Sequence, residues 1–322
     1  MTETSVYTVN DGRKGVTSTC FQGTQELEVN TSVGYQTSAI TTTNIIQQVI
    51  DWDDLPRWMR IDPYIRRGYR RELNSFYACL RSLFYLHNEL INTWSHLIPA
   101  LVYLAMLMGF DVKIFRYDLK DSTTCLADWT TIQIYVVGTM ICLGLSAFFH
   151  CTNAHSEAMA NRLLKLDYVG ICFSISVTNV SSTYFGLRDD PWLRNVYNTF
   201  CLTCALAVLL SMMAPGVDGP GAALFRVFTF LALMLSGCVP ILHIFIMQGY
   251  EGVEHFPLMH TALMGLCYLA GTCFYVTHWP EKRWPTTFDI WGASHQLFHV
   301  LIALGQFIFL LGLRNALLVV YT

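Results

Sequence analysis

Residues 130–149 have the sequence TTIQIYVVGTMICLGLSAFF, a run of twenty residues without a single Asp, Glu, Lys or Arg. Twenty residues of α-helix rise about 30 Å, which matches the hydrocarbon thickness of a bilayer. Backbone polar groups in that layer need partners within the chain, and a helix supplies them all internally. The run therefore predicts a membrane-spanning helix that is closed by His150.

Six further apolar blocks of similar length follow the same pattern. They are Asn92–Phe110, Tyr168–Leu187, Val196–Met213, Ala222–Met247, Pro257–Val276 and Ala293–Leu313. The chain of 322 residues is 53% hydrophobic and only 13% charged, whereas soluble domains are about one quarter charged. This composition excludes a disordered chain and an ordinary cytosolic enzyme, and the net charge of -3 provides no basic surface for nucleic acid. The predicted fold is all-α, a polytopic membrane protein with seven transmembrane helices.

The flanking segments differ from the blocks. Fifteen of the first 44 residues are Ser or Thr, and we expect residues 1–49 to form a disordered polar tail. Residues 50–91 form a juxtamembrane segment rich in Arg. Within it, 75–84 has apolar residues at helical spacing, which predicts a short amphipathic helix on the membrane surface with the arginines facing lipid headgroups. We assign residues 92–314 to the transmembrane domain and 315–322 to a short tail.

The distribution of Lys and Arg predicts the orientation of the chain. If the N-terminus is cytosolic, twelve Lys and Arg residues lie near segment ends on the inner side and six on the outer side. Inner loops of membrane proteins carry the excess of positive charge. We therefore expect a multi-pass protein of the plasma membrane or an endomembrane, with its N-terminus in the cytosol.

Four ionisable residues lie at membrane depth, where an ionisable side chain costs free energy, so the presence of each one needs an explanation. His150 closes the second block, Asp167 opens the third, and His295 and His299 open the seventh. Whichever side the chain starts from, these three segment ends lie on one face of the membrane. With the N-terminus inside, that face is the cytosolic leaflet.

These residues suit a zinc site. His295 and His299 are four residues apart and share one helix face, and His150 provides a third imidazole. Three neutral imidazoles leave a tetrahedral zinc ion with one open position, at which water is activated. Asp167 is then placed to accept a hydrogen bond from that water or to act as general base. Ser146, four residues before His150, could bind the water or an oxyanion. Taken singly, a histidine at a helix end is more often an interfacial side chain, and a serine more often packs between helices.

Other polar residues near the blocks have simpler interpretations. We expect His87 and His96 to form hydrogen bonds around Glu89 and Asn92. We expect Asp289 to cap the N-terminus of the last helix. Four further histidines have no partner at helical spacing and receive no role, namely His243, His255, His260 and His278.

Three motifs resemble one known family. The first is NELINTWSH at 88–96, the second is SAFFH at 146–150 followed by LDY at 166–168, and the third is PEKRWP at 280–285 followed by FDIWGASHQLFH at 288–299. Together they resemble the progestin and adipoQ receptor family, which includes adiponectin receptors, fungal Izh zinc-homeostasis proteins and bacterial haemolysin III-like proteins. The resemblance covers about 50–315 and is strongest to the fungal branch.

The resemblance implies a seven-helix fold inverted relative to G-protein-coupled receptors. It implies zinc held by His150, His295 and His299, with Asp167 and Ser146 near the bound water. It also implies ceramidase-type amide hydrolysis, with roles in lipid and zinc homeostasis, so the expected partner is a ceramide-like membrane lipid or another hydrophobic or protein ligand, and not a nucleic acid. Thr286 departs from the family, which often has Gly at this position of the loop.

Three functions stay open on the sequence. The first is a zinc-dependent lipid amide hydrolase. The second is a receptor or sensor in which zinc only ties helices together, which direct coordination by Asp167 would favour because it closes the site. The third is a metal or proton pathway, which the clustering of ionisable groups at one face disfavours.

Overall fold

The computed structural model describes residues 49–110 and 126–321. In these ranges seven helices are long and apolar enough to cross a membrane, which confirms the predicted fold class. They are α3 (Leu90–Ala105, continued by a π-helical turn over Met106–Phe110), α5 (Leu126–Thr152), α6 (Glu157–Gly186), α7 (Pro191–Met212), the pair α8 (Ala223–Ser236) and α9 (Cys238–Gln248), α10 (Leu258–Thr277) and α11 (Ser294–Tyr321). Of the expected tail over 1–49, residues 1–48 lie outside the described residues, as does the connector 111–125, while Val49 belongs to a short strand.

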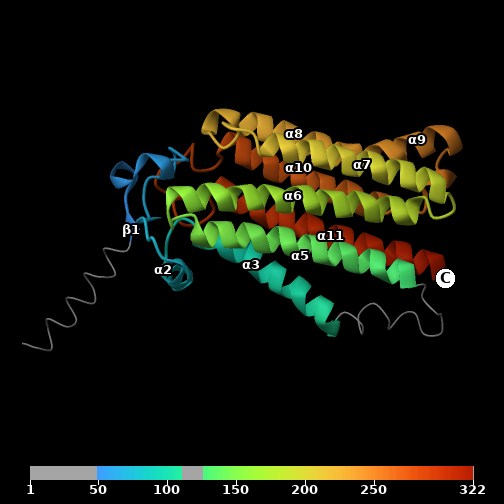
Figure 1. Cartoon of the computed structure of the whole chain (residues 1–322), viewed down its shortest axis with the longest axis horizontal. Coiled ribbons are helices and arrows are strands. Elements are labelled where there is room, and N and C mark those ends of the chain that lie inside the picture. Colours follow the sequence, from blue (N-terminus) through green and yellow to red (C-terminus); the bar gives the residue numbers. More distant parts are fainter. Residues whose placement is uncertain (1–48, 111–125, 322) are drawn as a thin grey trace, which may run out of the picture. The chain divides into compact units, whose positions relative to one another are not determined.

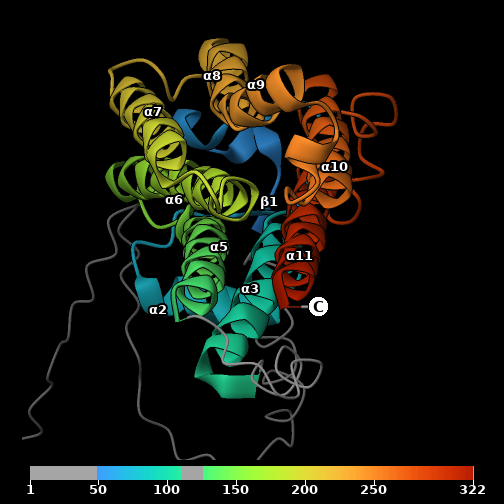
Figure 2. The same cartoon turned by 90° about the vertical axis from the view of Figure 1, so that its right-hand side faces the viewer.

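The spanning helices lie side by side, and α5 lies between α6 and α3 (Figures 1 and 2). It packs against α3 on one side and α6 on the other, while α11 packs against α10 and also contacts α3 and α5. Tyr135, Leu143 and Phe309 belong to a buried cluster that these helices share. Gly138 lets α5 and α6 approach closely, since a Cβ atom there would lie 2.4 Å from Val177. This packing brings the end of α5 beside the start of α11.

The juxtamembrane segment is folded rather than extended. Two short strands, β1 (Val49–Ile50) and β2 (Tyr69–Arg70), pair antiparallel. Three-residue 3-10 turns lie at Trp52–Asp54, Arg57–Met59 and Ser82–Phe84, with two more in later loops at Pro220–Ala222 and Glu251–Val253. Leu55, Ile65 and Tyr69 are buried in a cluster that also contains Ala293. The segment is therefore attached to the chain that enters α11.

The predicted surface helix is present but short. It is α2 (Phe76–Arg81), whose first turn is capped by the Ser75 hydroxyl, which accepts a hydrogen bond from Ala78 N. Phe76, Tyr77 and Leu80 are exposed on it, so its outer face is apolar. The expectation that the arginines face lipid headgroups is wrong for Arg70. Only 1% of this residue is exposed, because its guanidinium binds groups inside the protein.

Two features of the last helix differ from expectation. The structure shows helix through Tyr321, beyond the point where a tail over 315–322 was expected, because Ala316 and Leu317 join the buried cluster of the bundle. Asp289 does not cap this helix. Its Oδ1 accepts a hydrogen bond from Arg66 N at 3.0 Å, and α11 begins five residues later at Ser294.

An ion pair joins the far ends of α5 and α6. Asp128 in the first turn of α5 is fully buried. Arg188, just after α6, donates to both carboxylate oxygens at 2.7 and 3.1 Å, and the Tyr184 hydroxyl donates to Oδ1 at 2.7 Å. Removal of one member of such a pair leaves the other charge without compensation.

We therefore expect Asp128→Ala to lower the free energy of unfolding by about 3 kcal/mol, because Arg188 loses a buried bidentate partner. The measurement is thermal unfolding of the detergent-purified protein. Asp189→Ala is the matched control, since Asp189 is an exposed carboxylate in the same loop. Equal melting temperatures for the two variants would contradict the structural role of the pair.

Candidate metal centre

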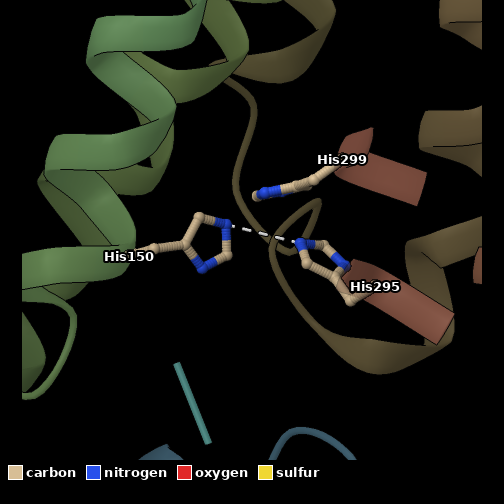
Figure 3. A group of neighbouring side chains, drawn as sticks. All are labelled: His150, His295 and His299. Atoms are coloured by element: carbon tan, nitrogen blue, oxygen red, sulfur yellow. Dashed lines mark hydrogen bonds between the residues drawn. The ribbon is translucent and has the colours of Figure 1, made fainter. Parts of the chain in front are cut away.

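Three histidines converge from two distant parts of the chain. His150 lies in the last turn of α5, and His295 and His299 lie in the first two turns of α11. Their ring centroids are 4.6 to 5.0 Å apart, and one nitrogen from each ring lies within 4.8 Å of the other two. Figure 3 shows the three rings directed toward one space between the helices. The fold thus brings together the three side chains that the sequence predicted to be close.

One nitrogen of the His150 ring faces one nitrogen of the His295 ring. Nδ1 of His150 lies 2.7 Å from Oε2 of Glu89, so this nitrogen carries the ring proton and Nε2 keeps a lone pair. That Nε2 lies 3.4 Å from Nε2 of His295. Two nitrogens bound to one tetrahedral zinc ion at their usual bond length are about 3.3 Å apart. The spacing and the lone pairs therefore fit a shared cation.

Helix α3 orients the third ring. Nδ1 of His299 lies 3.0 Å from the Asn92 carbonyl oxygen and 3.3 Å from the Ser95 hydroxyl. A carbonyl only accepts, so Nδ1 is the protonated nitrogen and Nε2 is left for a ligand. The ring of His96 stacks on that of His299 with centroids 3.7 Å apart, and its Nε2 lies 3.2 Å from the His299 carbonyl. These contacts hold the ring in one orientation.

Glu89 is the site residue that our sequence interpretation missed. Besides its contact with His150, Oε2 accepts a hydrogen bond from Asn92 Nδ2 at 2.8 Å. Burial alone would raise the pKa of this carboxyl, but the His150 ring and the two hydrogen bonds outweigh burial and lower the pKa below its usual range. The residue is therefore a carboxylate at neutral pH. A carboxylate on the far nitrogen of a ligating histidine is a recurrent feature of metal sites.

A signal for Glu89 was present in its spacing. Glu89, Asn92 and His96 follow one another at intervals of three and four residues, which places them on one face of a helix. The expected hydrogen bonds form only in part. His87 does accept from Glu89 N at 3.1 Å, whereas His96 contacts His299 on another helix.

Asp167 and Ser146 lie on neighbouring helices, α6 and α5. Their side chains are close enough to interact, and only 4% of the surface of Ser146 is exposed. Over 49–110 and 126–321, the group of mutually close donors around His150 consists of the three imidazoles and does not include Asp167. This geometry leaves the carboxylate free for a role other than direct coordination, and that role stays a prediction.

A second group of ligand-type side chains was not anticipated. Donor atoms of Asp62, His278 and Glu281 lie within 4.8 Å of one another. His278 Nδ1 lies 3.1 Å from Asp62 Oδ2. Both oxygens of Glu281 accept hydrogen bonds from Ser294, one from its backbone N at 2.8 Å and one from its hydroxyl. Glu281 is thus the N-terminal cap of α11 that Asp289 was expected to be.

The chain is similar in sequence to several known proteins. The model of the family described as "Haemolysin-III related" matches residues 84–310. The ADIPOR-like receptor IZH2 of Saccharomyces cerevisiae is 34% identical over 279 residues, which cover 84% of this chain and 85% of that protein. The ADIPOR-like receptor IZH1 of Eremothecium gossypii is 32% identical, covering 81% of this chain and 82% of that protein. The adiponectin receptor protein of Drosophila melanogaster is 30% identical over 81% of this chain and 58% of its own length.

We expect Glu89→Gln to weaken the binding of Zn²⁺ by about tenfold to one hundredfold, because the neutral amide lowers the basicity of His150 and orients it less firmly. The measurement is competition with a chelator of known affinity. Glu157→Gln is the control, since Glu157 is exposed in the first turn of α6. An unchanged affinity in Glu89→Gln would show that the carboxylate does not support a metal ligand.

The pair of His278 with Asp62 predicts a pH dependence of stability. The hydrogen bond that His278 donates to Asp62 raises the pKa of His278 above its ordinary value of 6.5. A raised pKa in the folded state stabilises the protein below pH 6.5, and this contribution is lost as the pH rises through the raised pKa. His278→Gln should lower the melting temperature by about 2 °C at pH 6 and by less at pH 8.5, since the side chain is 37% exposed and the pair is screened. The same loss at both pH values would contradict the assignment, and Asp62→Asn should add no further loss in the His278→Gln background.

Proposed function

The chain belongs to the haemolysin-III related family, and from this premise we propose that it is a membrane hydrolase that uses zinc to cleave the amide bond of a ceramide-like lipid. One observation carries the proposal. Three imidazoles from α5 and α11, of which His150 and His299 are buried and His295 is half-buried, direct their nitrogens at one point, and no carboxylate of the described chain joins their group. A site with three protein ligands and an open fourth position is the arrangement of catalytic rather than structural zinc.

The donor set supports zinc as the metal. Imidazole nitrogen is a borderline ligand that suits zinc well, whereas calcium and magnesium prefer oxygen. His150, His295 and His299 would hold the ion, with Glu89 and the Asn92 carbonyl holding the protonated nitrogens of two of the rings. When bound, zinc supplies a Lewis acid for the amide carbonyl and lowers the pKa of water to near neutral.

Side chains of the protein near the three histidines can accept and donate the proton that the hydrolysis transfers. Hydrolysis adds water across the C–N bond and yields a carboxylic acid and an amine. We assign Asp167 as the general base that takes a proton from the attacking water and returns it to the leaving amine nitrogen. Ser146, which lies beside Asp167, would orient this carboxylate and can turn its hydroxyl toward a developing oxyanion.

The position of the site suits a substrate from the bilayer. The Lys and Arg distribution favours a cytosolic N-terminus, which puts the ends of α5 and α11 at the cytosolic leaflet. An amide bond near the headgroups of that leaflet would then lie at the level of the three histidines, with the acyl chain still in hydrocarbon.

A receptor with a structural metal is the second candidate. The relatives named above carry the word receptor in their names. The three histidines would then serve to join α5 to α11, and α3 would join them through His299. Both candidates require the metal, and they differ in what Asp167 does.

The experiment compares metal content and ceramide turnover in protein reconstituted with ceramide-containing lipid. We expect about one zinc per chain in the wild type and little in His295→Ala or His299→Ala. Asp167→Asn should keep the zinc and lose at least about one hundredfold in turnover. Zinc-loaded wild type with no more turnover than His299→Ala would reject the hydrolase and leave the receptor. A wild type without metal would reject both.

A further inference from the structure

Arg70 is an arginine with 1% of its surface exposed, beside the end of α5. Its guanidinium donates to the carbonyl oxygens of His150 at 2.7 Å and Cys151 at 2.6 Å. It also donates to the Ser82 hydroxyl at 2.8 Å and to Asn153 Oδ1 at 2.6 Å. Every acceptor is fixed in position, so the guanidinium holds the last turn of the helix from several sides.

The C-terminal end of α5 needs hydrogen-bond donors such as the Arg70 guanidinium. The last four carbonyls of a helix have no partner within it, and they carry the negative end of the helix dipole. His150 and Cys151 are among these four residues, since α5 ends at Thr152. A buried cation that binds both carbonyls satisfies the acceptors and fixes where the turn lies.

The last turn of α5 contains His150, a proposed metal ligand, and two residues hold His150 in place. Arg70 binds the backbone of His150, and Glu89 binds Nδ1 of its ring. Burial lowers the pKa of the Arg70 guanidinium, and the negative charge of Glu89 acts in the opposite direction. A shift of the His150 backbone would therefore move its imidazole by a similar amount.

The neighbour of Arg70 on strand β2 packs at the entrance to the other ligand-bearing helix. Tyr69 is buried in the cluster with Ala293, which directly precedes α11. Adjacent residues of one strand therefore contact the end of α5 and the entrance to α11.

We propose that Arg70 is a positioning residue for the metal centre, which holds the last turn of α5 so that His150 stays opposite the histidines of α11. This inference rests on the metal binding of the proposed function. It assigns a role to the juxtamembrane segment, which contributes none of the three ligands itself.

The test measures metal binding directly, with Zn²⁺ affinity by chelator competition and the visible spectrum of bound Co²⁺ as a report of ligand geometry. The variant is Arg70→Lys, which keeps the charge but loses the fork that spans both carbonyls. The matched control is Arg188→Lys, which weakens a bidentate arginine at the opposite end of α5. Milder variants, Ser82→Ala and Asn153→Ala, remove single acceptors from Arg70 and leave the carbonyls and the histidines intact.

We expect Arg70→Lys to bind Zn²⁺ about tenfold to one hundredfold more weakly and to alter the Co²⁺ spectrum. Arg188→Lys should lower the melting temperature and keep both metal readouts within about twofold of the wild type. Unchanged metal affinity and spectrum in Arg70→Lys would overturn the proposal, whatever the loss of stability. If Arg70→Lys does not fold, the milder variants decide, and affinities equal to the wild type in both would overturn it. A wild type that binds neither ion would instead reject the proposed function.

Discussion

The structure depends on the convergence of three imidazoles at the ends of two membrane helices. Protonated nitrogens of His150 and His299 are occupied by Glu89 and by the Asn92 carbonyl, so their remaining lone pairs face inward. Nε2 of His150 lies 3.4 Å from Nε2 of His295, a distance at which one cation can bind both nitrogens. A cation there would also favour the negative charge of Glu89 behind the His150 ring.

Around this centre, each buried charge acts on a helix end or on a ring. Arg70 binds the last turn of α5, Glu281 binds the first residue of α11, and Glu89 binds His150. Segments outside the seven spans supply all three of these residues. The juxtamembrane segment and the loop before α11 are therefore parts of the site, since they determine where the two ligand-bearing helices begin and end.

The same geometry relates the two candidate functions. Both a hydrolase and a receptor need the three imidazoles, and both benefit from the groups that orient them. What separates them is the carboxylate of Asp167, which lies beside Ser146 and outside the group of mutually close donors. A carboxylate that coordinated the metal would close the site, whereas one that stands apart leaves room for water and for a carbonyl oxygen.

The sequence by itself determined the seven helices, because each apolar run of about twenty residues can satisfy its backbone in a bilayer only as helix. It also indicated His150, His295 and His299, because the order of crossings places these helix ends at one level. Only the tertiary structure decided the roles of Arg70, Glu89 and Glu281, and it replaced Asp289 by Glu281 as the cap of α11. A buried polar side chain takes whichever partner the packing brings within about 3 Å, and for Arg70 that partner lies 80 residues away in the chain.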